Sequence, residues 1–206
     1  MNSFTNTICV ILAGGKGSRL DGKGKYKEVL LDSPLWQHVY GRVKSQSIKV
    51  AVNLNKKTVK KKSIPENIDI VYDIFKEDIG PLAGIHAAIT YAGKKKNNNI
   101  LVCTVPVDTP FLPKNLLNNL YKDIKLKNSD VAVAMSNNRP HPTIALWKIK
   151  IKKILEEHIK KGTRKIDKFT ADLNVSYVDW DTSDIDPFFN VNNYSDLKLA
   201  KNMLKK

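Results

Sequence analysis

The sequence predicts an α/β fold in which helices cover both faces of a mostly parallel, twisted sheet. Apolar runs of strand length alternate with helical patterns along most of the 206 residues, as in a series of strand–helix–strand units. One run, Ile100 to Val105, is almost continuously apolar, which is typical of a strand covered on both faces. Neither an internal repeat nor a long linker is visible, so we expect a single domain spanning residues 1–206.

Hydrophobic spacing and end signals give the individual elements. Pro34 suits the first turn of a helix whose apolar face carries Leu35, Val39 and Val43, and Gly93 suits the end of another. The predicted helices are Pro34 to Gln46, a short basic helix near Thr58, Leu82 to Tyr91, Pro113 to Lys125, Ile149 to Lys160 and Tyr194 to Leu204. The predicted strands are Thr7 to Leu12, Lys49 to Asn53, Ile68 to Tyr72, Ile100 to Val105, Val131 to Met135, Thr143 to Trp147 and Val175 to Trp180.

The net charge of +15 raises the possibility of nucleic-acid binding. Only four of the 35 basic residues are arginines, however, and arginine is the side chain best suited to bidentate phosphate and base contacts. The lysines are dispersed in short groups along the chain, as on an ordinary solvated surface. Steering of small anionic substrates is compatible with this charge, and nucleic-acid binding is not favoured.

The two cysteines and the lengths of the hydrophobic stretches indicate in which cellular compartment the protein is expected. Cys9 and Cys103 each lie in an apolar run, so we expect buried, reduced thiols and neither a disulfide framework nor a cysteine-based zinc site. The longest mostly apolar stretches, Ile8 to Ala13 and Ile100 to Val107, are far shorter than the roughly 20 residues of a membrane helix. Because Met1 to Thr7 does not resemble a signal peptide, we expect a cytoplasmic protein without membrane contact.

A glycine-rich loop, Ala13 to Lys25, follows the first predicted strand. It is neither a dinucleotide fingerprint, because Leu20 replaces the third glycine, nor a P-loop, because Gly24 replaces the magnesium-binding Ser or Thr. Glycines at the carboxyl end of a parallel strand nevertheless let backbone N–H groups approach an anion, which favours a phosphate site over a merely flexible loop. The cations of this loop are Lys16, Arg19, Lys23 and Lys25.

Carboxylate and amide side chains recur where other predicted elements end. Asp108, between two prolines after the strand Ile100 to Val105, suits a magnesium ion that also contacts phosphate oxygens. Gly80 to Gly84, preceded by Asp73, forms a tight backbone that could line a base or ribose. Singly, such residues are also common in turns. Further amides able to contact a nucleotide or substrate are Asn53, Asn55, Asn190 and Asn192, and Arg139 and His141 could meet an anionic substrate.

Taken in order, these motifs resemble the molybdenum cofactor guanylyltransferases, the MobA family. The resemblance extends over nearly the whole chain, and the Gly80 and Arg139 segments make it more specific than the opening loop alone. The matching segments are Leu12 to Gly17 with Arg19 and Lys25, Pro34 to Val39, Val52 to Asn55, Gly80 to Gly84, Pro106 to Phe111, Arg139 to Leu146 and Asn190 to Asn192.

The resemblance implies a Rossmann-like nucleotidyltransferase fold and the transfer of GMP from GTP to the phosphate of molybdopterin, with release of pyrophosphate. It implies Mg²⁺ as the cofactor, held by Asp108, and a catalytic set of Arg19, Lys25 and Asp108. Asn190 and Asn192 match positions expected to meet the pterin. The GTP site that it implies comprises Leu12, Ala13, Gly14, Gly15, Lys25, Asn53, Asp73 and Asp108.

Three alternatives remain at this level: a cytidylyltransferase acting on molybdopterin, a sugar-phosphate nucleotidyltransferase, and a basic nucleic-acid-binding module. The expected partners are GTP, molybdopterin and other proteins of molybdenum cofactor biosynthesis. We expect a monomer or a weak oligomer.

Overall fold

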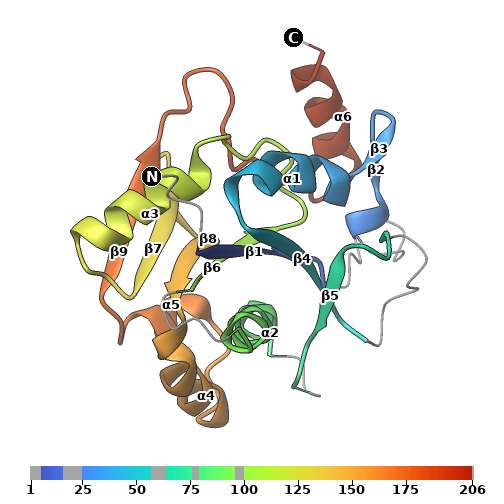
Figure 1. Ribbon diagram of the computed structural model, residues 1–206. Helices are drawn as coiled ribbons and strands as arrows, with labels where there is room; N and C mark the ends of the chain where they lie inside the picture. The colour runs from blue at the N-terminus through green and yellow to red at the C-terminus, as the bar shows by residue number, and fades with distance from the viewer. Residues whose placement is uncertain (1–5, 16–24, 57–63, 76–78, 96–99, 206) are drawn as a thin grey trace.

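The computed structural model describes residues 6–15, 25–56, 64–75, 79–95 and 100–205. Within these residues the chain forms a seven-stranded sheet with helices on both faces, together with a small two-stranded hairpin, β2 (Val29–Leu30) and β3 (Ser33–Pro34) (Figure 1). The sheet order is β5-β4-β1-β6-β8-β7-β9. Its strands are β1 (Thr7–Leu12), β4 (Lys49–Leu54), β5 (Asp69–Tyr72), β6 (Leu101–Pro106), β7 (Val131–Ser136), β8 (Arg139–Lys148) and β9 (Val175–Trp180).

The expectation of a mostly parallel sheet is confirmed, with one reversed strand. β1 runs parallel to β4 and β6, β4 to β5, and β7 to β9. β8 alone runs antiparallel to both of its neighbours, β6 and β7. The carboxyl ends of β6 and β7 therefore lie at the same edge of the sheet, and β8 begins at that edge.

Strand β8 is longer than the sequence predicts, because it begins at Arg139 rather than at Thr143. A two-residue turn, Asn137–Asn138, pairs Ser136 directly with Arg139, and both asparagines have positive φ (49° and 58°). Asparagine tolerates that conformation better than most residues. Two prolines, at positions 140 and 142, hide this part of the strand in the sequence, because proline has no backbone N–H to donate. They are tolerated since β6 pairs only with residues 145–148 of β8, so the prolines need no hydrogen bond to β6.

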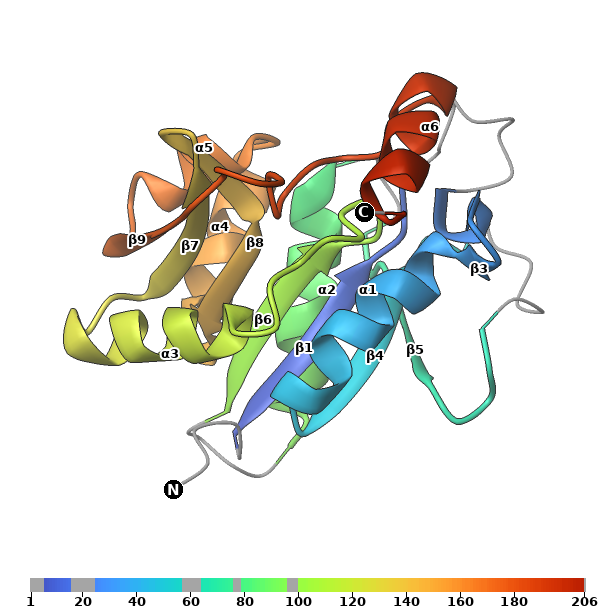
Figure 2. The ribbon, with the colours of Figure 1, turned by 90° about the horizontal axis from the view of Figure 1, so that it is seen from above.

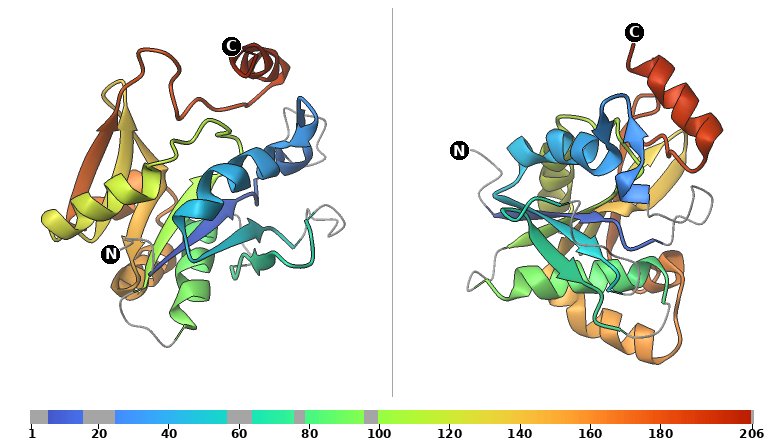
Figure 3. Two further views of the ribbon diagram at one scale, coloured as in Figure 1. Left: turned by 45° about the horizontal axis from the view of Figure 1, so that its top comes forward. Right: turned by 90° about the vertical axis from the view of Figure 1, so that its right-hand side faces the viewer.

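Helices cover the sheet on both sides (Figures 1 and 2). On one face lie α1 (Leu35–Val43) and α3 (Leu116–Leu126); on the other lie α2 (Pro81–Gly93), α4 (Lys152–Lys160) and α5 (Ile166–Thr170) (Figure 3). The last helix, α6 (Tyr194–Met203), contacts the small hairpin. Short 3₁₀ turns are η1 (Lys25–Lys27), η2 (Lys44–Gln46) and η4 (Ile149–Ile151).

Several predicted helix limits differ from the structure. The helix expected from Pro34 to Gln46 is α1 followed by η2, and the one expected from Ile149 is η4 followed by α4. α3 begins at Leu116 rather than Pro113, and α5 has no counterpart among the predicted elements. Gly93 is the last residue of α2, whose C-cap is Lys94 with ordinary right-handed φ, so no glycine conformation is used there. The helix expected near Thr58 lies outside the described residues.

The interior explains the near-continuous apolar strands. The side chains of β1 and β6 pack toward α1 and α3 on one face and toward α2 on the other, so both faces of these two strands are buried. Cys9 and Cys103, which stand opposite each other on β1 and β6, are fully buried and free, as predicted. No helix among the described residues has the length and apolar character that crossing a membrane requires.

Gln46 fastens α1 to α3 from inside the core. Its side chain is 2% exposed, donates to the backbone oxygens of Arg42 and Pro113 (2.7 and 3.0 Å), and accepts from the backbone N–H of Leu117 (3.0 Å). The Leu117 N–H belongs to the first turn of α3, where helices have unsatisfied donors, and the N-cap Asn115 makes no side-chain bond there. A side chain remote in sequence therefore caps this helix.

We predict that Gln46→Leu lowers the free energy of unfolding by about 2–3 kcal/mol, because it leaves buried backbone groups without partners. Chemical denaturation measures this change. Gln37→Leu, at an exposed position of α1, is the matched control and should change the free energy by less than about 0.5 kcal/mol. Equal effects of the two substitutions would contradict the capping role.

Candidate active site

The carboxyl ends of β1, β4 and β6 meet at one edge of the sheet. Leu12, the last residue of β1, stands opposite Asn53 of β4 and Pro106 of β6. Beyond the ladder, the Ala13 N–H donates to the Asn53 carbonyl (2.9 Å) and the Val107 N–H donates to the Leu12 carbonyl (3.1 Å). This edge is where open α/β sheets bind ligands.

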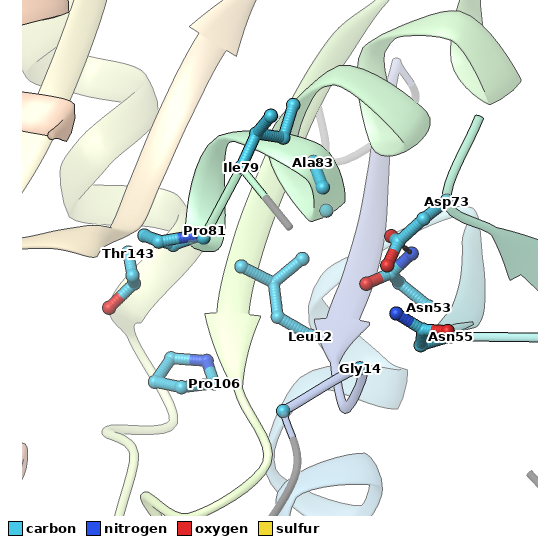
Figure 4. Close-up of a pocket in the computed structure, with 13 residues that line it drawn as sticks. Leu12, Gly14, Asn53, Asn55, Asp73, Ile79, Pro81, Ala83, Pro106 and Thr143 are labelled. Carbon is cyan, nitrogen blue, oxygen red and sulfur yellow. Dashed lines mark hydrogen bonds between the residues drawn. The ribbon is translucent and has the colours of Figure 1, made fainter. Parts of the chain in front are cut away.

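A cavity of about 410 Å³ opens at this edge, between the strand ends and the first turn of α2 (Figure 4). Of the residues predicted for nucleotide binding, Leu12, Gly14, Gly15, Asn53 and Asp73 line it. Ala13 does not; it is 5% exposed and belongs to the core on the α1 side. Asn55 and the Gly80 to Gly84 segment, also predicted to contact a nucleotide, contribute Asn55, Gly80, Pro81, Ala83 and Gly84 to the lining, and the remaining lining residues are Ile79, Pro106 and Thr143.

Asn53 and Asp73 form a fixed polar pair in the wall of the cavity (Figure 4). The Asn53 amide is 2% exposed and donates to the Asp73 carboxylate (2.8 Å) and to the Val71 carbonyl (3.2 Å). Both donor hydrogens are used, so the orientation of the amide is set and its oxygen faces α2. The pair presents an amide oxygen and a carboxylate to whatever occupies the cavity.

Two glycines let the backbone close around this pair. A Cβ on Gly84 would stand 2.8 Å from the Asn53 Oδ1 and 3.0 Å from a methyl of Leu12, so only glycine fits without displacement. Gly80, the N-cap of α2, has φ of 63°, which other residues rarely adopt. As a result the first turn of α2, whose backbone carries partial positive charge, forms one wall of the cavity.

A cluster of Lys25, Asp108 and Asn192 joins three distant parts of the chain. Lys25 begins η1, Asp108 follows β6 by two residues, and Asn192 precedes α6 by two. The Lys25 ammonium donates to Asp108 Oδ2 (2.7 Å) and to Asn192 Oδ1 (2.6 Å). The lysine and aspartate side chains are only 21% and 16% exposed, so this is a largely buried ion pair. The cluster lies beside the cavity, whose wall includes Pro106.

The second oxygen of Asp108 fits a role in holding a cation. Its Oδ1 is buried and has no hydrogen-bond partner among the described residues, whereas Oδ2 is paired with Lys25. Among the residues that the structure describes, no group of three or more His, Cys, Asp or Glu side chains could hold a metal ion by itself. The unpartnered Asp108 oxygen could serve as a ligand of Mg²⁺, which takes one or two protein carboxylates and completes its shell with substrate phosphates and water.

Arg139 and His141 lie on β8, outside the residues that line the cavity. Arg139 is exposed. The His141 ring is half-buried, bonded through Nε2 to the Ser136 hydroxyl (2.8 Å) and packed against Phe188. Burial lowers the pKa of His141 below its usual value, and the nearby Arg139 acts in the same direction while Asp186 opposes it. The side chain is thus a poor candidate for a permanently charged anion contact.

Other predicted site residues are placed as follows. Asn190 is half-buried next to Val191, which is fully buried. Arg19, Lys16 and Lys23 lie outside the described residues. The predicted base or ribose segment, Gly80 to Gly84, lines the cavity through Gly80, Pro81, Ala83 and Gly84. Ile79 and Thr143 were not expected in the site, because side chains that only close an apolar or neutral wall carry no chemical signature in the sequence.

The fold and this site define a nucleotidyltransferase: glycines, an amide–carboxylate pair and a lysine–aspartate pair converge at the carboxyl edge of a mostly parallel sheet. Comparison with known proteins makes the assignment narrower. Residues 9–175 match the family of MobA-like NTP transferase domains, and the chain belongs to that family.

Curated relatives and a solved structure agree with this family. The chain is 34% identical over 202 residues to the molybdenum cofactor guanylyltransferase of Rhizobium leguminosarum bv. trifolii, with 95% of this chain and 92% of that protein covered. It is 31% identical over 195 residues to that of Nitrobacter hamburgensis, with 94% and 92% covered. The structure of molybdopterin-guanine dinucleotide biosynthesis protein A from Archaeoglobus fulgidus superposes with a TM-score of 0.78 at 27% identity, covering 97% and 98% of the two chains.

We predict that Gly84→Ala destabilises the protein by about 1–2 kcal/mol, although alanine normally improves a helix interior by up to about 1 kcal/mol. The added methyl group must push the fixed Asn53 amide out of the cavity wall. Gly41→Ala is the control: nothing lies within 4 Å of a Cβ there, so it should gain about 0.5–1 kcal/mol. If denaturation shows equal stabilisation by both, Asn53 is not held as described.

Proposed function

We propose that this protein is a molybdenum cofactor guanylyltransferase, which transfers GMP from GTP to the phosphate of molybdopterin and releases pyrophosphate. The observation that carries the proposal is the buried Lys25–Asp108 pair beside a glycine-walled cavity at the sheet edge. The names and the near-complete coverage of the relatives support the choice of substrates.

The nucleoside part of GTP would occupy the cavity. Its volume of about 410 Å³ lies within the usual range of small-molecule sites. Guanine presents N–H donors along one edge, and ribose presents hydroxyl groups; the amide oxygen of Asn53 and the carboxylate of Asp73 can accept from such donors. The triphosphate would then extend along Gly14 and Gly15 toward Lys25, where backbone N–H groups and the ammonium favour negative charge.

The reaction joins two anions, and the side chains of the cluster reduce their repulsion. An oxygen of the molybdopterin phosphate attacks the α-phosphorus of GTP, a P–O bond forms, and the bond to the bridging oxygen breaks in line, so pyrophosphate leaves. Lys25, together with Arg19, would stabilise the charge that develops on pyrophosphate. Positioning supplies the rest, and no covalent enzyme intermediate is needed.

A magnesium ion, when bound, would polarise the phosphate oxygens and screen the approach of the acceptor. Asp108 is the residue that would hold it, because one of its oxygens is buried and without a partner among the described residues. The carboxylate is kept in place by Lys25 and by the backbone: the Asp108 carbonyl accepts from the Val191 N–H (2.8 Å).

The direct test measures pyrophosphate release from each of the four nucleoside triphosphates, with and without molybdopterin. Release should require both GTP and molybdopterin, because the proposal assigns a guanine site and a phosphate acceptor. Release from CTP instead would make the protein a cytidylyltransferase, and release with a sugar phosphate in place of molybdopterin would reassign the acceptor.

We predict that Asp108→Asn lowers kcat by at least about 10²-fold, because the amide removes the negative charge that would hold the metal. Turnover of GTP with molybdopterin at saturating Mg²⁺ measures the effect.

The control for this prediction is Asp123→Asn in α3. Asp123 also pairs with a lysine, Lys127, at 2.7 Å, and also keeps one buried carboxylate oxygen without a hydrogen-bond partner among the described residues, but it is not part of the site. Activity of Asp123→Asn should equal that of the unmodified protein. Near-normal kcat of Asp108→Asn would refute the assignment of Asp108.

A further inference from the structure

Residues 186–192, which we call the strap, connect the antiparallel half of the sheet to the Lys25 cluster. After β9 the chain crosses above the strand ends to α6 (Figure 2). At the start of the strap, Asp186 Oδ1 accepts from the Ser136 hydroxyl of β7 (3.0 Å). At its end, Asn192 Oδ1 accepts from the Lys25 ammonium (2.6 Å).

The start of the strap is anchored by a polar network in which the donors can be assigned. Ser136 is 1% exposed and its hydroxyl has a single proton, which goes to the Asp186 carboxylate because an ionised carboxylate only accepts. The hydroxyl oxygen therefore accepts from His141 Nε2, so the proton of a neutral His141 ring sits on Nε2. Asp186 Oδ1 also accepts from the Phe188 N–H (2.9 Å), which folds the strap back on its anchor.

Apolar packing keeps the middle of the strap from moving independently. Phe188 is 1% exposed and lies between the His141 ring (4.9 Å between centroids) and Trp180 (5.3 Å). Val191 is fully buried, and its N–H donates to the Asp108 carbonyl (2.8 Å). The middle of the strap is therefore joined to the anchor at one end and to the backbone of Asp108 at the other.

At the end of the strap, Asn192 is held from its own backbone. Its N–H donates to Asp196 Oδ2 (2.9 Å), and Asp196 forms the capping box of α6 with Asn193. The Asn192 amide oxygen is thus presented to Lys25 from a fixed backbone. With Asp108 it takes two of the three ammonium protons and directs Lys25 from two sides.

From these contacts we propose that Asn192 is a positioning residue that sets the orientation of Lys25, and that Ser136, His141 and Asp186 secure the strap that carries it. The contacts of Asn192 with pterin and of His141 with an anionic substrate stay predictions, and the proposal gives both side chains a role in the alignment of the lysine. The orientation of Lys25 is independent of any ligand, whereas its consequence for GTP rests on the proposed function.

The first experiment measures how fast Lys25 is acetylated. The folded, full-length protein is treated with an acetylating reagent for set times, and mass spectrometry then gives the acetylated fraction at Lys25. In the unmodified protein Lys25 should react slowly, because the amine must leave both partners to reach the reagent. Lys127, whose side chain is 51% exposed, is the internal reference. Asn192→Ala should raise the Lys25 rate by about tenfold, the equivalent of one hydrogen bond to a charged group.

Ser136→Ala should raise the Lys25 rate by a smaller factor, because its effect passes through the strap. Ser129→Ala is the matched control: Ser129 is fully buried and bonded to the Ser176 hydroxyl (2.8 Å), so it loses a similar bond away from the strap. An unchanged acetylation rate of Lys25 in Asn192→Ala would overturn the proposal. So would a rise of this rate in Ser129→Ala that equals the rise in Ser136→Ala.

The second experiment measures GTP affinity without molybdopterin in Asn192→Ala, Lys25→Met and the double variant. If Asn192 acts through Lys25, Asn192→Ala weakens binding about tenfold alone and has no further effect beside Lys25→Met. Additive effects, or unchanged GTP affinity with a raised KM for molybdopterin, would overturn the proposal and favour pterin contact. Failure of the unmodified protein to bind GTP would refute the proposed function, and the acetylation rates would still decide the role of Asn192.

Discussion

The ion pair between Lys25 and Asp108 is the interaction on which the site depends. A carboxylate that is 16% exposed is costly to bury without a counter-charge, and the lysine supplies one from a segment 83 residues away. The pair therefore draws the end of the glycine-rich loop onto the end of β6. Because Asn192 joins the same ammonium, the C-terminal helix is drawn to the same point.

Backbone register provides the frame for this pair. Leu12 and Pro106 end β1 and β6, and both lie at the level of Asn53, the last residue but one of β4, so the segments that follow these strands start from one edge. The hydrogen bonds of Ala13 and Val107 extend the alignment past the ladders. The cavity wall then depends on the absence of a side chain at Gly84, which allows α2 to approach Asn53 within contact distance.

Much of this arrangement is predictable from the sequence, and the exceptions have identifiable causes. Strands β1 and β6 are evident because burial on both faces leaves a continuous apolar signal, and the position of Asp108 follows from its strand. The start of β8 is not evident, because two prolines conceal a strand that needs few ladder bonds there. The pairing of Lys25 with Asn192, 167 residues apart, has no local signature at all, nor does the capping of α3 by Gln46.

The reversed strand β8 has a consequence for how such a site can diversify. The turn at Asn137–Asn138 opens on the same edge as the cavity, yet the Asn53–Asp73 pair and the first turn of α2 come from the other half of the sheet. Insertions or substitutions in this turn would change the protein surface next to β8 without changing the Asn53–Asp73 pair. A single inverted strand thus brings a turn of the antiparallel half of the sheet to the ligand-binding edge, next to Ser136 and His141, while Asn53 and Asp73 reach that edge from the parallel half.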